Sequence, residues 1–553
     1  MKTILFYLIL FGISVAAFAQ QPLQLQLEKR GEVIVSFDAM YLKLIPNVQS
    51  WSVDNIKNGK AYVYLNKKQY DKIIELNIPF VPEPIPSLIS QAKMAHSPNE
   101  VAEWDSYPDY ETYITIMNQF ATNYPNLCRL DTIGFSTENR LLLALKISDN
   151  VTDDEPEPEF FYTSSMHGDE LTGYVLMLRL ADYLLSNYET DEVKNLVDNI
   201  EIYINPLANP DGTFAAGNTT VNGATRENGN GIDINRNFPD PIYGNHPDDE
   251  EWQPETVAMM NFMKNRNFSL SMNFHGGAEV LNYPWDGTYD RHVDDYWMQL
   301  VCRSYADTVH TIDANYMTDL NDGITNGADW YLISGGRQDY VTHFLHGREI
   351  TTELSSVKLV NADELPSFWD KNYRSLLQFI NQALFGVNGF VTDTDDNPIN
   401  AKITVVGHDV DSSFVRTQEN GVFYRFLKAG TYNFRVQANG YITKTITNVV
   451  VNDFEATLLN VVLNKGTSIK NSFAASLKIF PNPTNGIITI SGHKLDGNTK
   501  INIYNLDGNK VWEQIGINAG NPNEIDLSFL TNGVYVFSIQ TKSGIATQKL
   551  IIK

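Results

Sequence analysis

The sequence predicts an α/β domain followed by two β-rich domains, and three observations carry that prediction. Between about residues 105 and 385, helical and β-type runs alternate, as in a sheet with crossover helices. After Gly386 the helical pattern stops, and short β-runs such as Ala401–Val406 are separated by turns such as Asn439-Gly440. A second β-rich stretch starts near Ser476 and reaches Lys553. The expected fold class is therefore α/β, followed by two all-β sandwich domains.

The composition agrees with folded domains and limits the classes of partner. The chain has 553 residues, of which 43% are hydrophobic and 19% are charged, as in ordinary globular proteins. With 41 Lys and Arg against 66 Asp and Glu, the net charge is −25. Such a charge repels phosphate backbones, so nucleic acid is not an expected partner. Two cysteines, Cys128 and Cys302, cannot form a disulfide framework, and whether they pair stays open.

The first residues predict a signal peptide at 1–19 and therefore an exported protein. Lys2 precedes the apolar run Ile4–Ala16, and Ala17-Phe18-Ala19 matches a cleavage site. The apolar run is shorter than the roughly 20 residues that a membrane-spanning helix needs. No transmembrane segment is expected in the rest of the chain.

Residues 20–95 are expected to form a separate N-terminal α+β region. Strand-like runs at Val33–Phe37 and Ala61–Leu65 are followed by a helical pattern at Lys67–Leu76. The proline-rich segment Val81–Pro86 breaks both periodicities. A linker at 96–104 then leads to the α/β domain.

A candidate metal-binding pair follows a buried strand in the α/β domain. The run Glu159–Ser164 ends just before His167 and Glu170, and a helical pattern follows. Open α/β sheets bind ligands at the carboxyl ends of their strands, and an H-x-x-E pair can hold one Zn²⁺. The spacing recurs at His346 and Glu349, so the pair alone is not specific.

A third candidate ligand lies far along the chain. His275 ends the apolar run Ser271–Phe274 and precedes two glycines. A short-spaced pair, a distant third ligand and an open position are typical of catalytic zinc sites. We therefore expect one Zn²⁺ held by His167, Glu170 and His275, although each histidine taken singly could be structural.

Three further charged residues indicate what the metal acts on. Arg226 and Arg236 flank a glycine-rich segment, and arginine suits carboxylate capture and oxyanion stabilisation. Glu353 lies within the β-run Ile350–Leu354, where a carboxylate is costly unless it is paired or functional. It could act as a general base toward water. The alternative for the arginines is an ordinary surface position.

Taken in order, these motifs resemble the zinc metallocarboxypeptidases, specifically their regulatory carboxypeptidase N/E/D branch, over about residues 105–385. The resemblance implies a mixed central sheet with helices on both faces. In this family the early H-x-x-E binds the metal, so His346 and Glu349 are not expected to be metal ligands. The motifs that carry the resemblance are His167-x-x-Glu170, Asn209-Pro210-Asp211-Gly212, Arg226, Gly231–Asp240, His275-Gly276-Gly277, Tyr331–Asp339 and Thr352-Glu353-Leu354.

The resemblance also implies a role for each site residue. Glu353 would be the general acid/base, and Arg226 would polarise the scissile carbonyl. The terminal carboxylate of the substrate would be bound by Asn235, Arg236 and Tyr331.

Substrate preference rests on a smaller set of residues. Asp286 and Gln338 match the positions that imply C-terminal Arg or Lys, although Asp286 could instead cap its Asp-Gly turn. Arg337 departs from the apolar residue that relatives commonly carry, and a cation beside the pocket would weaken a basic preference.

The flanking segments resemble known companions of this domain. Residues 386–465 resemble a transthyretin-like sandwich, and a linker at 466–475 precedes a type IX secretion sorting domain at 476–553. The latter rests on Ile479–Thr484 and the closing Gln548–Lys553. The region 20–95 could be a pro-segment that covers the active site, or a folding aid.

The expected function is that of a secreted or cell-surface zinc-dependent exopeptidase. It would hydrolyse the C-terminal peptide bond of peptides or proteins, favouring Arg or Lys, and would meet the secretion machinery through its C-terminal domain. The alternatives are a zinc amidase acting on cell-wall peptides and an inactive surface binding protein. The presence of Glu353, Arg236 and all three ligands argues against inactivity.

Overall fold

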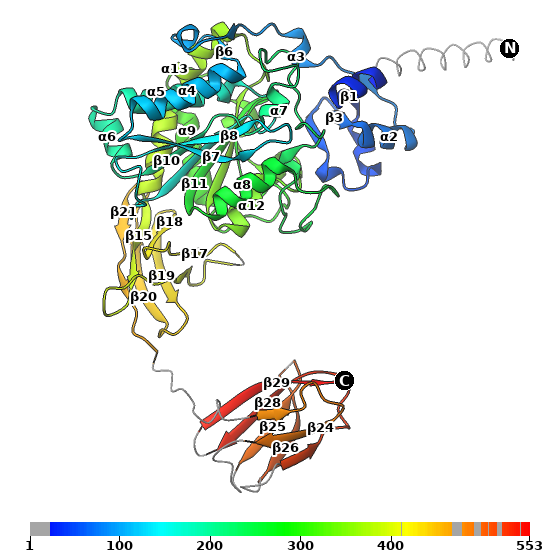
Figure 1. Ribbon diagram of the computed structural model, residues 1–553, viewed down its shortest axis with the longest axis vertical. Coiled ribbons are helices and arrows are strands. Elements are labelled where there is room, and N and C mark those ends of the chain that lie inside the picture. Colours follow the sequence, from blue (N-terminus) through cyan, green and yellow to red (C-terminus); the bar gives the residue numbers. More distant parts are fainter. Residues whose placement is uncertain are drawn as a thin grey trace, which may run out of the picture. The chain divides into compact units, whose positions relative to one another are not determined.

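The computed structural model describes residues 23–410, 412–466, 478–491, 499–506, 508–516, 523–541 and 544–553 (Figure 1). They form two compact units. One reaches as far as Leu463 without residues 439–442, and the other combines 439–442 with 464–553. The expected signal peptide at 1–19, and all but Gly466 of the linker expected at 466–475, lie outside the described residues.

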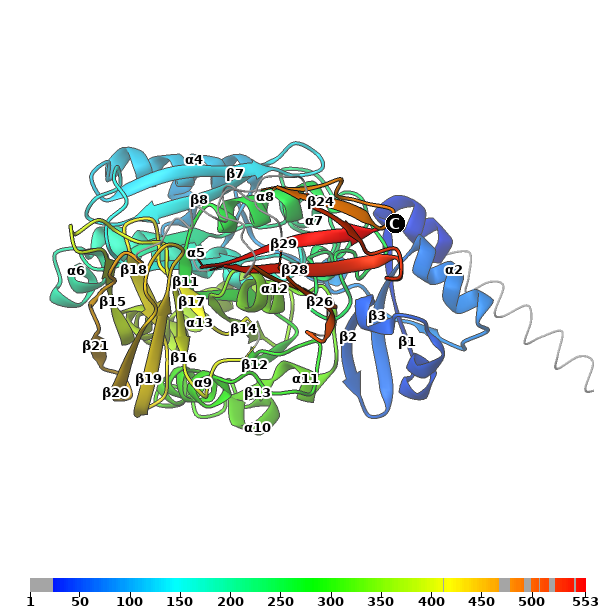
Figure 2. The same ribbon diagram turned by 90° about the horizontal axis from the view of Figure 1, so that it is seen from below.

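The N-terminal region, residues 23–95, contains helices and a four-stranded antiparallel sheet. A helix over 23–30 leads into an antiparallel sheet of order β2-β3-β1-β4, in which β1, β2 and β3 lie side by side (Figure 2). Asn66 begins α2 with a reciprocal capping box to Gln69, which fixes the turn from β3 into the helix. The elements are β1 Glu32–Asp38, β2 Ser52–Lys57, β3 Lys60–Asn66, α2 Lys67–Glu75 and β4 Val81–Pro82.

The α/β domain is built on an eight-stranded mixed sheet of order β13-β12-β14-β11-β9-β10-β8-β7. The central strands β14, β11, β9 and β10 are parallel, whereas β12 and β8 run antiparallel to their inner neighbours. The mixed sheet expected from the resemblance is thereby confirmed. The strands are β7 Cys128–Phe135, β8 Leu141–Ile147, β9 Glu159–Ser164, β10 Glu201–Asn205, β11 Phe268–His275, β12 Ala278–Tyr283, β13 Ile324–Asn326 and β14 Arg348–Ser355.

Helices cover both faces of this sheet because its central strands are apolar on both sides. In β9, Phe160 and Tyr162 belong to one hydrophobic cluster, while Phe161 between them belongs to another. The first cluster includes side chains of α4 Tyr110–Asn123, α5 Thr172–Ser186, α9 Asp295–His310 and α13 Leu365–Asn381. The second includes side chains of α8 Pro254–Lys264 and α12 Arg337–Phe344.

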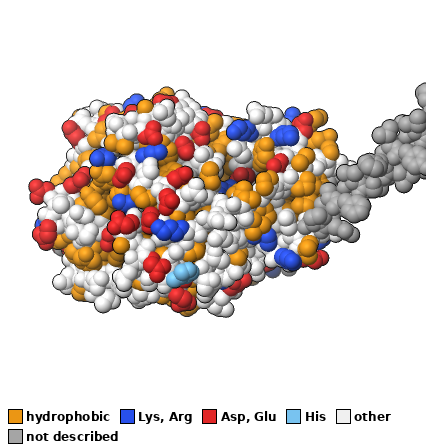
Figure 3. Space-filling model, turned by 90° about the horizontal axis from the view of Figure 1, so that it is seen from above, with side chains coloured by type: hydrophobic (Ala, Val, Ile, Leu, Met, Phe, Trp, Pro, Cys, Tyr) orange, Lys and Arg blue, Asp and Glu red, His pale blue; other side chains and the backbone are white. Residues whose placement is uncertain are grey.

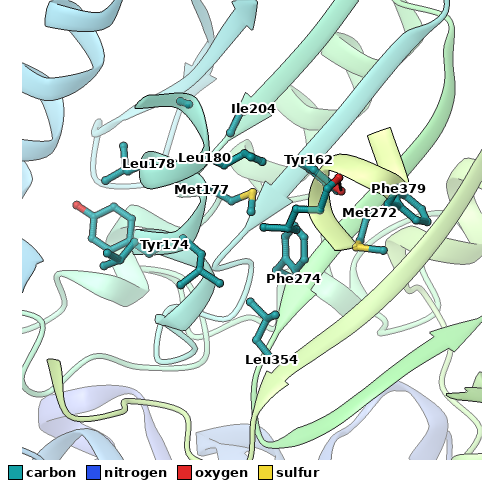
Figure 4. Packing of buried hydrophobic residues seen from close by; sticks show 14 of the residues in the cluster. Tyr162, Tyr174, Met177, Leu178, Leu180, Ile204, Met272, Phe274, Leu354 and Phe379 are labelled. Atoms are coloured by element: carbon teal, nitrogen blue, oxygen red, sulfur yellow. Dashed lines mark hydrogen bonds between the residues drawn. The ribbon is translucent and has the colours of Figure 1, made fainter. Parts of the chain in front are cut away.

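The larger cluster forms the main core of the α/β domain. In Figure 4, Tyr162 and Phe274 lie between Met177 of α5 and Phe379 of α13. The rings of Tyr162 and Phe274 are 5.1 Å apart, centroid to centroid. Cys128 and Cys302 are buried in the same cluster and neither forms a disulfide.

The first β-sandwich begins where the sequence pattern changes, with β15 at Gly386–Thr392. One sheet has the order β18-β15-β21 with β22 beside β15, and the other has the order β17-β16-β19-β20. The remaining strands are β16 Lys402–Val405, β17 Val415–Arg416, β18 Val422–Arg425, β19 Gly430–Gln437, β20 Lys444–Val451, β21 Ala456–Leu458 and β22 Val461–Val462.

A buried ion cluster joins the first β-sandwich to the α/β domain. The Asp294 carboxylate, just before α9, is 2.7 Å from Arg348 Nη2. Arg425 of β18 donates to both oxygens of the same carboxylate, at 2.8 and 2.9 Å. His408 Nε2 lies 2.8 Å from it as well. All of these except His408 are buried, so each charge depends on the others for compensation.

The C-terminal unit is a second β-sandwich with its own core. A three-stranded sheet of order β23-β24-β27 and a four-stranded sheet of order β26-β25-β28-β29 enclose a cluster that includes Ile488, Ile503 and Phe537. Its strands are β23 Lys478–Phe480, β24 Ile487–Ser491, β25 Lys500–Tyr504, β26 Lys510–Ile515, β27 Asn523–Asp526, β28 Gly533–Thr541 and β29 Gly544–Ile552.

Two surface properties bear on partners. Acidic side chains are spread over the face drawn in Figure 3, among basic and hydrophobic ones. Within the described ranges, none of the helices combines the length and apolar character that a bilayer crossing requires.

Candidate active site

The three predicted metal ligands meet at the carboxyl ends of two adjacent parallel strands. His167 and Glu170 lie in the turn between β9 and α5, and His275 is the last residue of β11. Since Phe274 of β11 is in register with Ser164 of β9, the two strands end side by side. The parallel pairing therefore brings together residues that are distant in sequence.

The ligand atoms face one another at short distances. Glu170 Oε2 is 3.0 Å from His167 Nδ1 and 2.9 Å from His275 Nδ1, and the two Nδ1 atoms are 3.0 Å apart. All three side chains are buried. Two imidazole nitrogens and one carboxylate oxygen are the donor set of a catalytic zinc site, which leaves further positions open.

The imidazoles are oriented by side chains behind them. His167 Nε2 is 3.2 Å from Asp233 Oδ1, an arrangement that fixes the tautomer of a metal-binding histidine. Asn273 Nδ2 faces His275 Nε2 at 2.7 Å, while Asn273 Oδ1 is buried without a partner among the described residues. Turning that amide over lets Nε2 donate to Oδ1 and leaves Nδ1 free for a metal.

The protonation states also fit a metal. Burial lowers the pKa of His275 to about 4, so its imidazole is neutral near pH 7. Burial alone would raise the pKa of Glu170, but the charges of His167 and Lys358 outweigh it and hold the pKa well below its usual range. A neutral histidine and an ionised carboxylate are the forms that bind zinc.

Two cations surround the remaining oxygen of Glu170. Arg226 Nη1 is 3.2 Å from Glu170 Oε1, and Arg226 Nε donates to Asp233 Oδ2 at 3.0 Å. Lys358 Nζ lies 2.5 Å from the same Glu170 oxygen. Arg226 was predicted from the sequence as a site residue, whereas Lys358 and Asp233 were not. The available signal was a lone lysine in the otherwise apolar Val357–Val360 and an aspartate ahead of Asn235.

Glu353 is held opposite His275 in the sheet. β14 pairs in parallel with β11, and Glu353 is in register with His275. Its Oε2 is buried and has no hydrogen-bond partner among the residues described. Burial, and then the charge of Glu170, raise the pKa of Glu353 well above its usual range. A carboxyl group in this state can exchange a proton with a bound water or amine.

One cavity of about 560 Å³ of empty space brings the predicted residues together. Its lining includes the metal ligands, Glu353 and Arg226, and also Asn235 and Arg236 of the short helix η4 Ile234–Arg236. Tyr331, which follows α11 Gly327–Trp330, lines it too, and burial raises the pKa of Tyr331 to about 12. The phenol therefore stays a neutral hydrogen-bond donor.

Asp286 lines the same cavity, and Gln338 contacts Asp286. Gln338 Nε2 donates to Asp286 Oδ1 at 2.9 Å. A Cβ on Gly327 would lie 1.7 Å from Asp286 Oδ1, so only glycine leaves room for the carboxylate there. Burial, followed by the charge of Asp339, raises the pKa of Asp286 well above its usual range. A cation brought into the pocket would restore the ionised form.

Arg337 does not face the pocket as a free cation. Its Nε and Nη2 donate to the two oxygens of Glu349 at 2.9 and 2.8 Å, and both side chains are fully buried. Glu349 is thus engaged by Arg337 and by Ser271 Oγ, while His346 Nδ1 is 2.8 Å from Ser412 O. The second H-x-x-E is therefore a packing element, and its residues are absent from the metal-compatible groups found in the described part of the chain.

The N-terminal region enters the cleft, which the motifs alone did not locate. Trp51 O accepts from Arg236 Nε at 3.2 Å, and Ser52 Oγ donates to Asp233 Oδ2 at 2.7 Å. Asp54 Oδ1 is 2.8 Å from Lys358 Nζ. Residues 51–54 therefore run across the cleft from Arg236 to Lys358.

Comparison with known families agrees with this geometry. The family model described as zinc carboxypeptidase matches residues 113–375, and the carboxypeptidase regulatory-like domain matches 386–464. The secretion system C-terminal sorting domain matches 478–553.

The curated relatives are carboxypeptidases by name. Carboxypeptidase D of Homo sapiens is 37% identical in an alignment 412 residues long that covers 70% of this chain but only 29% of that protein. The catalytic chain of carboxypeptidase N from Homo sapiens is 36% identical over 398 residues, covering 64% of this chain and 85% of that one.

Solved structures share the fold. Carboxypeptidase A from Helicoverpa armigera gives a TM-score of 0.50 at 17% identity, over 64% of this chain and 98% of that one. Thrombin activatable fibrinolysis inhibitor gives a TM-score of 0.50 at 18% identity, over 64% of this chain and 99% of that one. Its matched domains, its relatives and a ligand triad that fits zinc show that the chain belongs to the zinc carboxypeptidase family and carries a regulatory-like and a sorting domain.

Proposed function

We propose that this chain is an exported, zinc-dependent exopeptidase that hydrolyses the C-terminal peptide bond of peptides or proteins. The observation that supports this most is a single cavity lined by the ligand triad, a buried arginine and a carboxyl group whose Oε2 has no hydrogen-bond partner among the described residues. The triad is His167, Glu170 and His275, the carboxyl group is Glu353, and the arginine is Arg236. This set accounts for metal binding, proton transfer and recognition of a free C-terminus together.

Recognition of the C-terminus falls to Arg236, Asn235 and Tyr331. Arg236 is 2% exposed, and its guanidinium opens on the cavity. A terminal carboxylate can accept two parallel hydrogen bonds from it, whereas an internal residue has only an amide to offer. Tyr331 donates its phenolic hydrogen to the same carboxylate. This pairing restricts cleavage to the last peptide bond.

Proton transfer falls to Glu353, and charge stabilisation to Arg226. When bound, zinc would supply Lewis-acid activation of water and of the scissile carbonyl. Glu353 accepts the proton that water loses on attack and delivers it to the nitrogen of the departing amino acid. Arg226 donates a hydrogen bond to the carbonyl oxygen as negative charge develops there. The products are the shortened peptide and one free amino acid.

We assign selectivity for a basic last residue of the substrate to Asp286. Its carboxylate lines the cavity and is steadied by Gln338. Arg337 does not oppose this preference, because Glu349 neutralises it. We therefore assign a preference for C-terminal Arg or Lys.

The test is release of the last residue from short peptides that differ only in ending with Arg, Lys or Phe. We expect zinc in the purified protein and faster release of Arg and Lys than of Phe. Release of Phe but not Arg would reject the role of Asp286. A zinc-loaded protein that releases none of the three, even after the segment behind Pro86 has been cut and the N-terminal region removed, would reject the exopeptidase function.

We also propose that the N-terminal region covers the cleft as a pro-segment. Residues 51–54 start at Arg236 and leave toward Lys358, whereas a substrate would end at Arg236. The region thus lies in the cleft with the opposite chain direction and offers no terminal carboxylate. Arg30, which donates to the carbonyl oxygens of Gly223 and Ala224, helps to hold it there.

Export is supported by the sorting domain matched at 478–553. A secreted or cell-surface location and contact with a secretion system follow from that domain. Peptide and protein C-termini would be the substrates met there.

A further inference from the structure

Lys358 places a buried ammonium group beside the ligand triad, against Asp54 and Gly276, which line the cleft. The residue is 5% exposed. Its Nζ lies 2.5 Å from Glu170 Oε1, 2.8 Å from Asp54 Oδ1 and 3.4 Å from Gly276 O. Arg226 Nη1 approaches the same Asp54 oxygen at 3.7 Å. Lys358 and Arg226 together form a cationic site, called here the Lys358–Arg226 site.

The structure shows this site with a carboxylate in it. Asp54 of β2 supplies the carboxylate, and Tyr64 of β3 supplies an aromatic ring. The ring centroid is 5.2 Å from Lys358 Nζ and 5.5 Å from Arg226 Cζ. Both groups come from the N-terminal region, so they leave the site together if that region moves away. In the structure, the group bound at the Lys358–Arg226 site is therefore an acidic side chain.

Without Asp54, Arg226 still has Asp233 as a partner at 3.0 Å, whereas Lys358 loses one of its two carboxylate partners. Among the described residues, Glu170 is then the carboxylate within 4.0 Å of Lys358 Nζ. Its Oε1 is already shared with Arg226, and its Oε2 faces both imidazoles. Buried cations without a matched anion are costly, so the vacated site attracts a new carboxylate.

The position of the site identifies which substrate residue reaches it. Trp51 and Asp54 are three residues apart, and extended chain of that length spans at most about 10 Å. A peptide with its terminal carboxylate on Arg236 has its scissile carbonyl near Arg226. The next side chain toward the N-terminus is that of the penultimate residue, and Arg226 borders the site that Asp54 occupies.

We propose that the Lys358–Arg226 site selects peptides whose penultimate residue is Asp or Glu, with Lys358 as the specificity-determining residue. This inference rests on the proposed function, because it takes Arg236 as the anchor of the substrate C-terminus. Asp54 is the intramolecular occupant of the same site.

The experiment compares two peptides ending in Glu-Arg and Gln-Arg, which have nearly the same shape and differ in one charge. Their dissociation constants are measured by calorimetry on the zinc-loaded full chain carrying Glu353→Gln, which binds without turnover. The N-terminal region lowers the apparent affinity of both peptides by the same factor, so their ratio is unaffected by it. We expect the Glu peptide to bind about tenfold more tightly, as for one charge-assisted contact.

Variants assign the preference to Lys358. Adding Lys358→Met should bring the ratio to about one, whereas Lys358→Arg should keep most of the preference. Lys371→Met is the matched control, since Lys371 lies on α13 and pairs with Asp313 at 2.9 Å. Zinc content is measured for each variant, because Lys358 also contacts Glu170. Moving the glutamate one residue further from the C-terminus should abolish the preference without any change to the protein.

The outcomes separate this proposal from the one on which it rests. A ratio near one with Lys358 intact, or a ratio that Lys358→Met leaves unchanged, overturns the acidic subsite. An unmodified chain that binds both peptides and carries zinc, yet releases no arginine, overturns the exopeptidase function instead. If neither peptide binds even after the segment behind Pro86 has been cut and the N-terminal region removed, both proposals are contradicted.

Discussion

Glu353 lies within a strand, where burying a carboxyl group without a partner costs free energy. Because of that cost, a functional role for Glu353 could be predicted from the sequence. We expect Glu353→Gln to lower the rate of peptide hydrolysis by about 10²–10⁴-fold, because the amide keeps the shape but cannot accept a proton. Zinc content should be unchanged, as Glu353 is not in the ligand triad. Glu279→Gln on the neighbouring β12 is the control. A native rate in Glu353→Gln would contradict the assigned role.

We expect the charge of Asp286 to set the preference for a basic last residue. Asp286→Asn keeps the hydrogen-bonding shape toward Gln338 but removes the charge that a basic side chain needs. We expect kcat/KM for an Arg-ending peptide to fall by about 10–100-fold relative to a Phe-ending one, as for loss of a buried ion pair. Parallel measurements with the two peptides give the ratio. An unchanged ratio would mean that another residue sets the preference.

Among the residues around Glu170, some could be predicted from the sequence as site residues and others could not. His167, Glu170 and His275 were accessible because each follows an apolar run and because strand ends gather at one edge. Lys358 and Asp54 were not, since neither belongs to a motif. Their roles arise from contacts across long stretches of chain, which local patterns do not encode. The expected weakening by Arg337 was likewise undecidable until its partner Glu349 was seen.

At the scale of elements, α12 and β14 are joined by the Arg337–Glu349 pair. Removing one member leaves the other buried and unpaired, which costs about 3–5 kcal/mol. We expect Arg337→Met to lower the thermal midpoint of the α/β domain. The double variant Arg337→Met with Glu349→Leu should recover most of the loss, since apolar side chains can fill a buried ion-pair site.

The same variant checks the pocket. If Arg337 acted as a free cation beside Asp286, Arg337→Met would increase the preference for Arg over Phe. We expect that preference to stay the same, measured as the ratio of kcat/KM. A clear increase would show that Glu349 does not neutralise the guanidinium.

β1 carries a pH-dependent contact with the α/β domain through Glu32. Its carboxyl group accepts from the backbone N–H groups of Arg226 and Glu227, at 3.0 and 3.2 Å from Oε2. Burial, and then the charge of Asp169, raise the pKa of Glu32 from 4.5 to about 8, against the opposing charge of Arg30 3.8 Å away. Buried Glu227, whose pKa is raised by burial and by the charge of Glu32, faces the same group.

The direction in which stability changes with pH follows from the number of protons that the folded and unfolded states bind. Between pH 4.5 and about 8 the folded state holds more protons on Glu32 than the unfolded chain does, so stability falls as pH rises through that window. For one group the slope is at most about 1.4 kcal/mol per pH unit. We expect Glu32→Gln to gain stability relative to the unmodified chain between pH 5 and pH 9, measured by thermal unfolding. A difference that does not vary with pH would contradict the raised pKa.

At the scale of the whole molecule, the order of domains was readable from sequence, but the path of the N-terminal region was not. The change of periodicity near Gly386 marked the first β-sandwich, and β15 begins there. The entry of residues 51–54 into the cleft depends on tertiary contacts such as Ser52 with Asp233, which leave no trace in local composition. The proline-rich Val81–Pro86 indicated a boundary without indicating what lies on either side of it.

The segment after Pro86 offers a direct test of the cover. Leu88 and Ile89 are 54% and 71% exposed, and Lys93 is exposed as well. We expect limited trypsin or chymotrypsin treatment of the full chain to cut there and to raise the rate of peptide hydrolysis by at least tenfold, since the N-terminal region can then dissociate. Gel analysis of the cut and the rate are followed together. A chain cut at this segment whose rate does not change would show that the region does not restrict access.

The Asp294 cluster has a consequence for shortened chains. Arg425 lies in the first β-sandwich, yet its guanidinium matches both oxygens of a carboxylate that belongs to the α/β domain. A truncation ahead of β18 would remove Arg425 and leave the buried Asp294 carboxylate with only part of its counter-charge. The sandwich thus supports the α/β domain from within rather than being a separable module, and shortening the chain to the matched residues 113–375 would destabilise that domain.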